Sequence, residues 1–413
     1  MLLHLDRARD FMRRCGLDAL VAASWVNITY LTDYYNWIDP LFREYMMAPG
    51  ASSSLGQGFA VLPLEGEPAL IISPLNLVNA ADLWVRDIVT FGAYGLDEAV
   101  PSAALTGEGP RLLATLTQPA VAASPVEALL HVLRSRGLAD GRLGLDREGL
   151  TASASAALPS ALPRAQVKDA SNLFRLIRAV KCPEEIRRLE RSAQINEDVG
   201  LETLALAGPG RSALDLVHHY RARVAALGTD YDHFSFSPWG MGITSEAAYN
   251  FAPGDIQFVD FGCLYGRYFS DTGMTLAVGD AAPAMLERHA ALRAAMAAGM
   301  AAIGPGVRSS TVRGAMGQAL RDNGVTASNP HGHGLGLEIR DYPILVPDNG
   351  LRLRDDCIDE PSDLPLEVDM VFNLESAIFT AGAGSVHIER TFVVTPGGCR
   401  PLVPQDRSGV IQR

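Results

Sequence analysis

The sequence is poor in cysteine, in basic residues and in long apolar runs. Its five cysteines show no CxxC spacing, so neither a thiolate metal site nor a disulfide framework is expected. Lys and Arg number 35 against 47 Asp and Glu, a net charge of -12, which disfavours nucleic acid and anionic membranes as partners. No uncharged run reaches membrane-spanning length, and the first ten residues lack an apolar signal core. We therefore expect a cytoplasmic protein.

The chain has enough apolar sequence for more than one core, because 48% of its 413 residues are hydrophobic and only 20% are charged. Residues 1–177 alternate short apolar runs with helical patterns, which predicts an α/β domain. Residues 178–413 predict an α+β domain, in which helices back a curved antiparallel sheet. The clearest predicted elements are helices over Leu5–Cys15, from Pro183, over 283–303 and over Ser309–Asp322, and a strand over Arg142–Leu145.

The stretch from Val259 to Thr275 is the most informative part of the sequence. Two runs rich in β-branched and aromatic residues flank a turn at residues 265–267, which predicts a β-hairpin. Asp260 lies on the first strand and Asp271 on the second, so we expect their carboxylates to face each other. A buried pair of carboxylates is costly unless a cation, a shared proton or solvent neutralises it. The pair is a candidate metal site, although a lone strand aspartate is more often solvated or ion-paired.

Three further segments place ligand-type side chains in apolar, glycine-punctuated surroundings. His331 and His333 lie in a glycine-rich turn, where the backbone can approach another group closely. Glu375 and Glu389 lie in two strand-like runs joined by the loop 380–384, so these carboxylates are also expected to face each other. Four carboxylates and one imidazole favour Mn, Fe or Co over a zinc site with thiolate ligands. Such a set suits two ions about 3.5–4 Å apart that activate a water molecule.

The order of these residues resembles that of the pita-bread metallohydrolases, the family of methionine aminopeptidase, aminopeptidase P, prolidase and creatinase. Asp260 is followed eleven residues later by Asp271, then by His333 in a GHGLG motif, Glu375 and Glu389. The resemblance implies that all five bind two divalent metal ions, with Asp271 and Glu389 as bridging ligands. Manganese is the commonest ion in the similar enzymes, and Fe, Co or Zn are alternatives.

Segments outside the site extend the resemblance over nearly the whole chain. Residues 16–21 and 27–31 are similar to the creatinase-type N-terminal domain, and Lys181 begins a segment similar to the junction in aminopeptidase P and prolidase. The resemblance implies a creatinase-type α/β domain over 1–177 and a pita-bread catalytic domain over 178–413. It also implies a homodimer.

Several positions depart from the pattern of the peptidases in this family. Those peptidases carry a histidine shortly before the first aspartate, whereas this chain has none between His233 and Asp260. A second family histidine is replaced by Arg340, which does not release its proton at working pH. The family's Thr/Ser-Arg pair is Gly273 and Met274 here. An ordinary dipeptidase or X-Pro peptidase is therefore not expected.

Other side chains are candidates for the missing roles. His331 lies two residues before the metal-binding histidine, and His387 is expected on the same strand face as Glu389 because side chains alternate. Either could shuttle a proton or orient a carboxylate ligand. His233 is a weaker candidate. Arg340 could hold a substrate carboxylate through a bidentate pair, or form a surface salt bridge with a nearby acid.

The leading hypothesis is a metallohydrolase that cleaves a C–N bond, of the amide, peptide or amidine type, in a small carboxylate-bearing substrate. Metal-bound hydroxide is the nucleophile, Glu375 its general base and His331 the donor to the leaving nitrogen. One alternative is a lyase of the dimethylsulfoniopropionate-lyase type with Tyr249 or Asp341 as the base, although Gly262 stands where such an enzyme has a third aspartate. Further alternatives are a conventional X-Pro peptidase and a non-catalytic binding module, which the retention of all five ligands disfavours.

Overall fold

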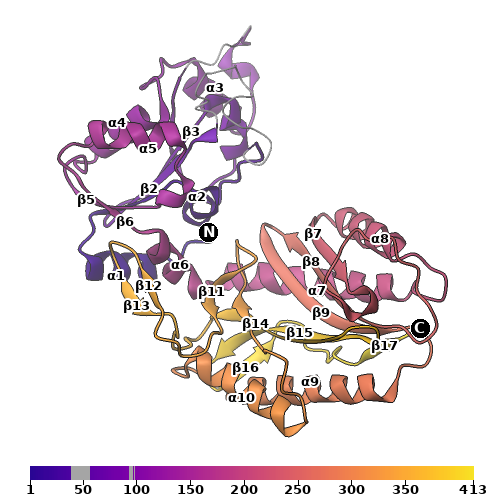
Figure 1. Ribbon diagram of the computed structural model, residues 1–413. Coiled ribbons are helices and arrows are strands. Elements are labelled where there is room, and N and C mark those ends of the chain that lie inside the picture. Colours follow the sequence, from indigo (N-terminus) through magenta and orange to yellow (C-terminus); the bar gives the residue numbers. More distant parts are fainter. Residues whose placement is uncertain (39–55, 93–95, 97) are drawn as a thin grey trace. The chain divides into compact units, whose positions relative to one another are not determined.

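The structure, a computed structural model, describes residues 1–38, 56–92, 96 and 98–413 (Figure 1). The chain forms two compact units. The units comprise Met1–Ile177 with Leu353–Asp359, and Arg178–Arg352 with Glu360–Arg413. A short segment from late in the chain thus packs with the N-terminal unit. Among the described helices, none combines the length and the apolar character that a membrane span requires.

A six-stranded mixed sheet forms the centre of the N-terminal unit. Its strands are β1 (Ala19–Ala22), β2 (Phe59–Pro63), β3 (Ala69–Ile72), β4 (Asp87–Thr90), β5 (Arg142–Leu145) and β6 (Gln166–Asp169). Their order is β4-β3-β2-β1-β5-β6, with β1 antiparallel to β2 and parallel to β5. β1, β2 and β3 are buried along their whole length, which is why they read as continuous apolar runs.

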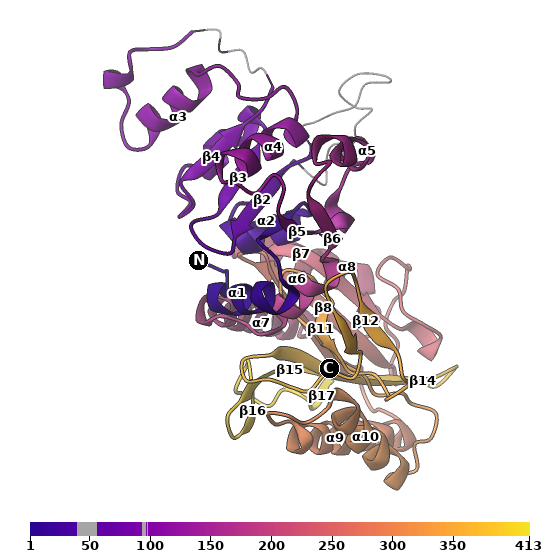
Figure 2. The same cartoon turned by 90° about the vertical axis from the view of Figure 1, so that its left-hand side faces the viewer.

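The α-helices described in this part of the chain are α1 (Leu5–Cys15), α2 (Trp25–Thr32), α3 (Gly109–Thr117), α4 (Pro125–Ser135), α5 (Ala152–Ala161) and α6 (Ser171–Ala179). Among them, α2 packs on β1 and β2, and α4 packs on β3 and β4 with α5 beside it (Figures 1 and 2). α1 has the predicted bounds and ends at Gly16, whose φ of 65° is accessible to glycine without steric cost. Leu129 on α4 and Leu158 on α5 share a core with Phe59 and Leu143 of the sheet.

The C-terminal unit is built on a nine-stranded sheet. Its strands are β7 (Asp230–Phe236), β8 (Ile256–Tyr265), β9 (Tyr268–Ala277), β10 (His333–Gly334), β11 (Asp341–Ile344), β14 (Val371–Thr380), β15 (Gly384–Thr395), β16 (Gly398–Pro401) and β17 (Val410–Gln412). The main path β11-β10-β14-β15-β9-β8-β7 is antiparallel throughout, with β16 beside β15 and β17 beside β9. A separate two-stranded sheet pairs β12 (Arg352–Arg354) with β13 (Asp359–Pro361).

Four of the described helices back the nine-stranded sheet (Figure 1). They are α7 (Pro183–Leu204), α8 (Ala213–Ala226), α9 (Pro283–Ala302) and α10 (Ser309–Asp322). α7 and α8 pack on β7, β8 and β9, while α9 packs on β14 and β15 with α10 beside it. α7 begins at Pro183, and the backbone N–H of Cys182 donates to Glu185 at 2.7 Å, which caps the helix. The predicted antiparallel sheet backed by helices is confirmed.

Glu197 on α7 is a buried carboxylate whose charge the fold disfavours. It is 6% exposed, and Arg407 lies 3.5 Å from its Oε2 atom, which no hydrogen bond reaches among the described residues. Burial raises the pKa of Glu197 to about 7, although Arg407 offsets part of the effect.

We expect a Glu197→Gln variant to gain on the order of 2 kcal/mol in its free energy of unfolding at pH of about 8. The pKa of Glu197 in the folded state exceeds its ordinary value of 4.5, so the folded state binds more protons than the unfolded state between about pH 4.5 and 7. The wild type therefore loses stability across that window as the pH rises. Urea denaturation at about pH 5 and about pH 8 measures both proteins. An equal effect of the substitution at both pH values would contradict this expectation.

Candidate metal centre

β8 and β9 bring two aspartates to the face of the sheet that α7 does not cover. Asp260 and Asp271 lie on that face because side chains alternate along a strand. The sequence predicted that the two aspartates face each other, but they are not directly opposite. Asp260 pairs with Gly273, and Asp271 pairs with Gly262. The two aspartates are therefore diagonal neighbours, and each has a glycine across from it.

β14 and β15 add two glutamates to the same face. Glu375 and Glu389 are directly opposite in the register, as predicted. Glu389 is also opposite Gly273 on β9, and this pairing joins the two hairpins into one continuous surface. Four carboxylates from four strands thus gather on one side of the sheet.

His333 on β10 adds an imidazole. Its Nε2 atom lies 3.6 Å from Oδ2 of Asp271, while its Nδ1 atom faces a backbone carbonyl at 3.2 Å. The Nδ2 atom of Asn373 lies 3.0 Å from the same Nε2 atom and donates to Glu389. Burial and the charge of Arg340 lower the pKa of His333 to about 4, so the ring is neutral near pH 7. A neutral imidazole is the form that binds metal.

The carboxylate cluster has the properties of a cation site. Burial and the neighbouring charge of Asp260 raise the pKa of Asp271, and burial and the charge of Asp271 raise that of Glu389. Among the described residues, no hydrogen bond reaches Oδ1 of Asp271. The donor atoms form three groups, each within 4.8 Å: His233, Asp260 and Asp271; Asp271, His333 and Glu389; Glu375, His387 and Glu389. Asp271 and Glu389 each belong to two groups, and these nitrogen and oxygen donors fit a pair of divalent ions.

A cavity of about 540 Å³ opens beside Glu375. His331, Arg340 and apolar side chains including Phe258 and Ile378 line it. The Nε2 atom of His331 lies 2.8 Å from Oε2 of Glu375, and this hydrogen bond raises the pKa of His331. Arg340 therefore adds a positive charge to the wall of a largely apolar cavity that Glu375 also lines.

His387 lies inside the cluster. Its ring is fully buried, with the Nε2 atom 3.5 Å from Oε1 of Glu375 and 3.9 Å from Oε2 of Glu389. The face shared with Glu389 is the one that strand alternation predicted.

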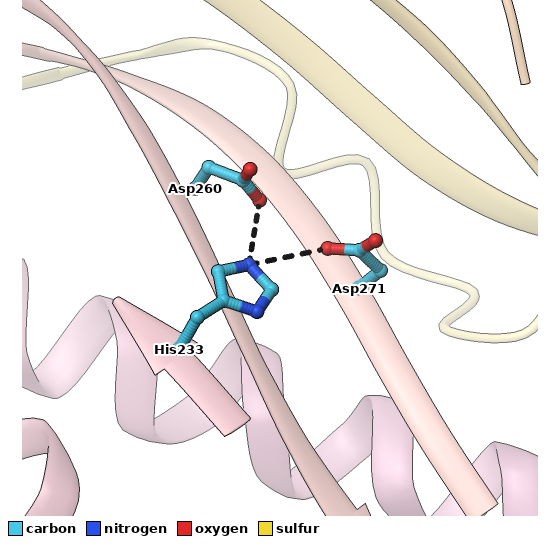
Figure 3. A group of neighbouring side chains, drawn as sticks. All are labelled: His233, Asp260 and Asp271. Atoms are coloured by element: carbon cyan, nitrogen blue, oxygen red, sulfur yellow. Dashed lines mark hydrogen bonds and ion pairs between the residues drawn. The ribbon is translucent and has the colours of Figure 1, made fainter. Parts of the chain in front are cut away.

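His233 on β7 is the functional candidate that sequence reasoning ranked too low. Its Nε2 atom lies 3.1 Å from Oδ1 of Asp260 and 3.5 Å from Oδ1 of Asp271 (Figure 3). Burial by itself lowers the pKa of His233, but hydrogen bonds with Asp232 and Asp260 outweigh it and raise the pKa to about 11. The only sequence signal was the strand pattern around His233, because its contact with Asp260 depends on the pairing of β7 with β8.

The two residues proposed as bases for a lyase make other interactions. The hydroxyl of Tyr249 donates to Asp255 at 2.6 Å. The buried carboxylate of Asp341 lies 3.3 Å from Arg178 and 3.4 Å from Lys181. Neither Tyr249 nor Asp341 belongs to the three donor groups found among the described residues. These contacts do not test the lyase hypothesis, which stays a prediction from the sequence.

A Gly273→Ala variant is expected to destabilise the protein by about 1–3 kcal/mol, the usual cost of overpacking. A Cβ at this position would lie 2.1–2.6 Å from ring atoms of His387. That ring has little freedom to move, because it stacks on Phe258 at a centroid distance of 4.0 Å and its Nδ1 atom bonds to the carbonyl of Val259. Denaturant unfolding measures the loss. The double variant Gly273→Ala/His387→Ala should cost less than the sum of the single variants, and strict additivity would refute the clash.

Comparison with known proteins assigns both halves of the chain to known families. Residues 187–396, just over half of the 413-residue chain, match the model of metallopeptidase family M24. The chain belongs to this family. Residues 4–180 match the Creatinase/Prolidase N-terminal domain. The M24 protein is accordingly a metallohydrolase, and the predicted resemblance is confirmed.

Relatives of this M24 protein match it over nearly its whole length. It is 27% identical to the uncharacterized peptidase YqhT of Bacillus subtilis, over 99% of this chain and 100% of the relative. It is 23% identical to an Xaa-Pro dipeptidase of Lactobacillus delbrueckii subsp. lactis, over 97% and 96%. A dipeptidase crystal structure from Pyrococcus horikoshii matches it with a TM-score of 0.74 at 18% identity, over 99% of each chain. The predicted fold, a pita-bread domain after a creatinase-type N-terminal domain, is confirmed.

Proposed function

We propose that this M24 protein is a dinuclear metal-dependent hydrolase that cleaves an amide, peptide or amidine-like C–N bond in a small carboxylate-bearing substrate. The observation that carries the proposal is a set of four carboxylates and one imidazole gathered beside a cavity lined by an arginine. The proposed metal ligands are Asp260, Asp271, His333, Glu375 and Glu389, with Asp271 and Glu389 bridging. Bound divalent ions would supply a water of lowered pKa and polarise the scissile carbonyl or amidine carbon. Manganese is the first candidate by resemblance, followed by Fe, Co or Zn.

The protein's own side chains then position the reactants and move protons. Burial raises the pKa of Glu375, but the hydrogen bond with His331 and the neighbouring imidazole of His387 outweigh it and hold the pKa below its ordinary value. The ionised Glu375 is thus ready to accept a proton from the attacking water. His331, half-exposed and 2.8 Å from Glu375, donates a proton to the leaving nitrogen. His387 lies 3.5 Å from the carboxylate of Glu375, on its buried side.

The substrate class follows from the wall of the cavity. Arg340 stands where the similar peptidases carry a histidine, and its guanidinium suits bidentate recognition of a carboxylate. The neighbouring apolar side chains, among them Phe258 and Ile378, favour an apolar group on the same substrate. These features support a small acid with one C–N bond to cleave, rather than the X-Pro dipeptides of the named relatives.

The resemblance to the pita-bread metallohydrolases supports two further proposals, which are domains at 1–177 and 178–413 and a homodimer. We also propose a cytoplasmic location, because the five scattered cysteines suit a reducing compartment. Light scattering of the purified protein tests the dimer, for which the expected mass is twice that of one chain.

The function is tested by metal analysis and turnover on the same sample. We expect about two ions per chain after loading with Mn²⁺, and hydrolysis of N-acyl or amidino acids but not of X-Pro dipeptides. Cleavage of the dipeptides alone would restore a conventional peptidase and refute the substrate proposal. A protein that retains no metal would refute the dinuclear proposal.

An Arg340→Gln variant is expected to lower kcat/KM by about 10- to 100-fold for a substrate with a free carboxylate, the scale of a lost charged hydrogen bond. The loss should appear mainly in KM and should be small for the same substrate amidated at that carboxylate. Steady-state kinetics on the acid and amide pair measure it. Arg293→Gln, which alters an exposed arginine paired with Asp406, is the matched control and should change neither constant. Equal losses on acid and amide would contradict the carboxylate contact.

A further inference from the structure

His233 presents one ring nitrogen to the aspartates and secures the other. Its Nδ1 atom lies 2.7 Å from Oδ2 of Asp232, and its Nε2 atom faces Asp260 at 3.1 Å and Asp271 at 3.5 Å (Figure 3). When Nδ1–H donates to Asp232, the lone pair of Nε2 points toward two carboxylates that also carry lone pairs. Such an arrangement needs a proton or a cation between the nitrogen and the oxygens.

His387 repeats this arrangement at the glutamates. Its Nδ1 atom lies 3.2 Å from the carbonyl of Val259, which can only accept, so Nδ1 carries the proton. The ring stacks on Phe258, and its Nε2 atom faces Glu375 at 3.5 Å and Glu389 at 3.9 Å. This nitrogen is fully buried, and no hydrogen bond reaches it among the described residues. A buried nitrogen without a partner is costly unless a ligand supplies one.

Two glycines make room for the two rings. A Cβ at Gly262 would lie 2.7 Å from Cε1 of His233, and a Cβ at Gly273 would lie 2.1 Å from Cε1 of His387. Gly262 and Gly273 are the residues across from Asp271 and Asp260 in the hairpin register. The sheet therefore leaves out a side chain at the two positions where an imidazole approaches the cluster.

The arrangement of both rings matches that of metal-bound histidines. Such a histidine almost always donates its other ring N–H to a carboxylate or a backbone carbonyl, as His233 and His387 do. Two donors about 2.1 Å from one ion lie about 3–3.4 Å apart. The nitrogen–oxygen distances are 3.1 and 3.5 Å at His233 and 3.5 and 3.9 Å at His387, so three of the four pairs are slightly wider than in a metal-bound site. We infer that His233 and His387 are further ligands of the metal centre, His233 beside the aspartates and His387 beside the glutamates. This inference rests on the proposed dinuclear site.

The two histidines change the character of the donor set. With His333 they bring three imidazole nitrogens to four carboxylates, whereas the five proposed ligands contain one nitrogen. Imidazole favours Zn and Fe, while a set dominated by carboxylates suits Mn. The seven-residue set thus shifts the preference of the centre from Mn²⁺ toward Zn²⁺ and Fe²⁺, relative to the five-residue set.

The first test is proton NMR of the full-length protein loaded with Co²⁺, whose paramagnetism displaces the ring N–H signals of bound imidazoles. Three displaced, exchangeable signals are expected, from His233, His333 and His387. His233→Ala and His387→Ala should each lose one signal, while His331→Ala should keep all three. A single signal in the wild type overturns the inference, and a variant that keeps every signal overturns it for the substituted histidine.

The second test measures metal binding by equilibrium dialysis with Zn²⁺ and with Mn²⁺. His233→Ala and His387→Ala should each weaken Zn²⁺ binding by more than the about 10- to 100-fold that outer-shell partners cost, and weaken Mn²⁺ binding less. His387→Gln is measured together with His387→Ala, because His387 is fully buried and alanine would leave a cavity. Thermal unfolding checks that each variant folds. His289→Ala removes another buried imidazole of the same unit, on α9, and should leave metal binding unchanged.

The outcomes separate this inference from the proposed function. The wild-type chain could bind two Zn²⁺ ions while folded His233 and His387 variants bind them equally well. That result would overturn the inference of two extra ligands and leave the proposed dinuclear site intact. A wild-type protein that binds no metal would overturn both proposals. Selective loss of Zn²⁺ affinity in the two variants supports the inference.

Discussion

An Asp271→Asn variant should lose its metal ions and its activity together, with kcat/KM at least about a thousandfold below the wild type. Asp271 belongs to two of the three donor groups, so its substitution weakens both halves of the centre. Asparagine keeps the size of the side chain but removes the charge that a divalent ion requires. Elemental analysis of the dialysed variant and initial rates on the same sample measure both losses.

Without metal, this variant should be more stable than the wild type. Burial and the charge of Asp260 raise the pKa of Asp271, so at neutral pH the empty site disfavours the ionised carboxylate. Removing that carboxylate should raise the thermal unfolding midpoint of the protein treated with EDTA. Asp363→Asn is the matched control, because this buried aspartate accepts hydrogen bonds from Ser309 and Ser310, and its loss should lower stability without altering metal content. An Asp271→Asn variant that keeps both ions and full activity would refute the assignment.

A Glu375→Gln variant should lower kcat by about 10²- to 10⁴-fold, the contribution of a positioned general base. Glutamine can still accept the hydrogen bond from His331 and can still offer a carbonyl oxygen to an ion, so metal content should fall less than in Asp271→Asn. Rates and metal content measured together separate lost proton transfer from lost metal.

The double variant Glu375→Gln/His331→Gln provides the control for this role. If Glu375 and His331 pass one proton along a shared route, the second substitution should cost much less than it does alone. A Glu375→Gln variant with wild-type kcat would exclude the residue as the base. Additive losses would place His331 outside the proton route.

The spacing of residues along the sequence was enough to predict much of the fold and most of the proposed site. The helix Ser309–Asp322 and the strand Arg142–Leu145 have the bounds that the sequence predicted, because caps, glycines and apolar periodicity mark their ends. Glu375 and Glu389 are opposite each other because a short loop fixes the register of a hairpin. Asp260 and Asp271 share a face for the same reason, although their offset by two residues was not predicted.

The amino-acid sequence by itself predicted which carboxylates share a face, since alternation and short turns depend only on neighbours along the chain. The resemblance to the pita-bread metallohydrolases singled out His333 as the proposed imidazole ligand. The tertiary structure alone decided that β15 lies beside β9, that β7 brings His233 to Asp260, and that His387 fills the space over Gly273. These contacts join strands separated by long connections, and their free energy comes from burial on the helices behind the sheet. Local propensity contains no information about such pairings, which is why the contacts of His233 and His387 with both carboxylate pairs became visible only in three dimensions.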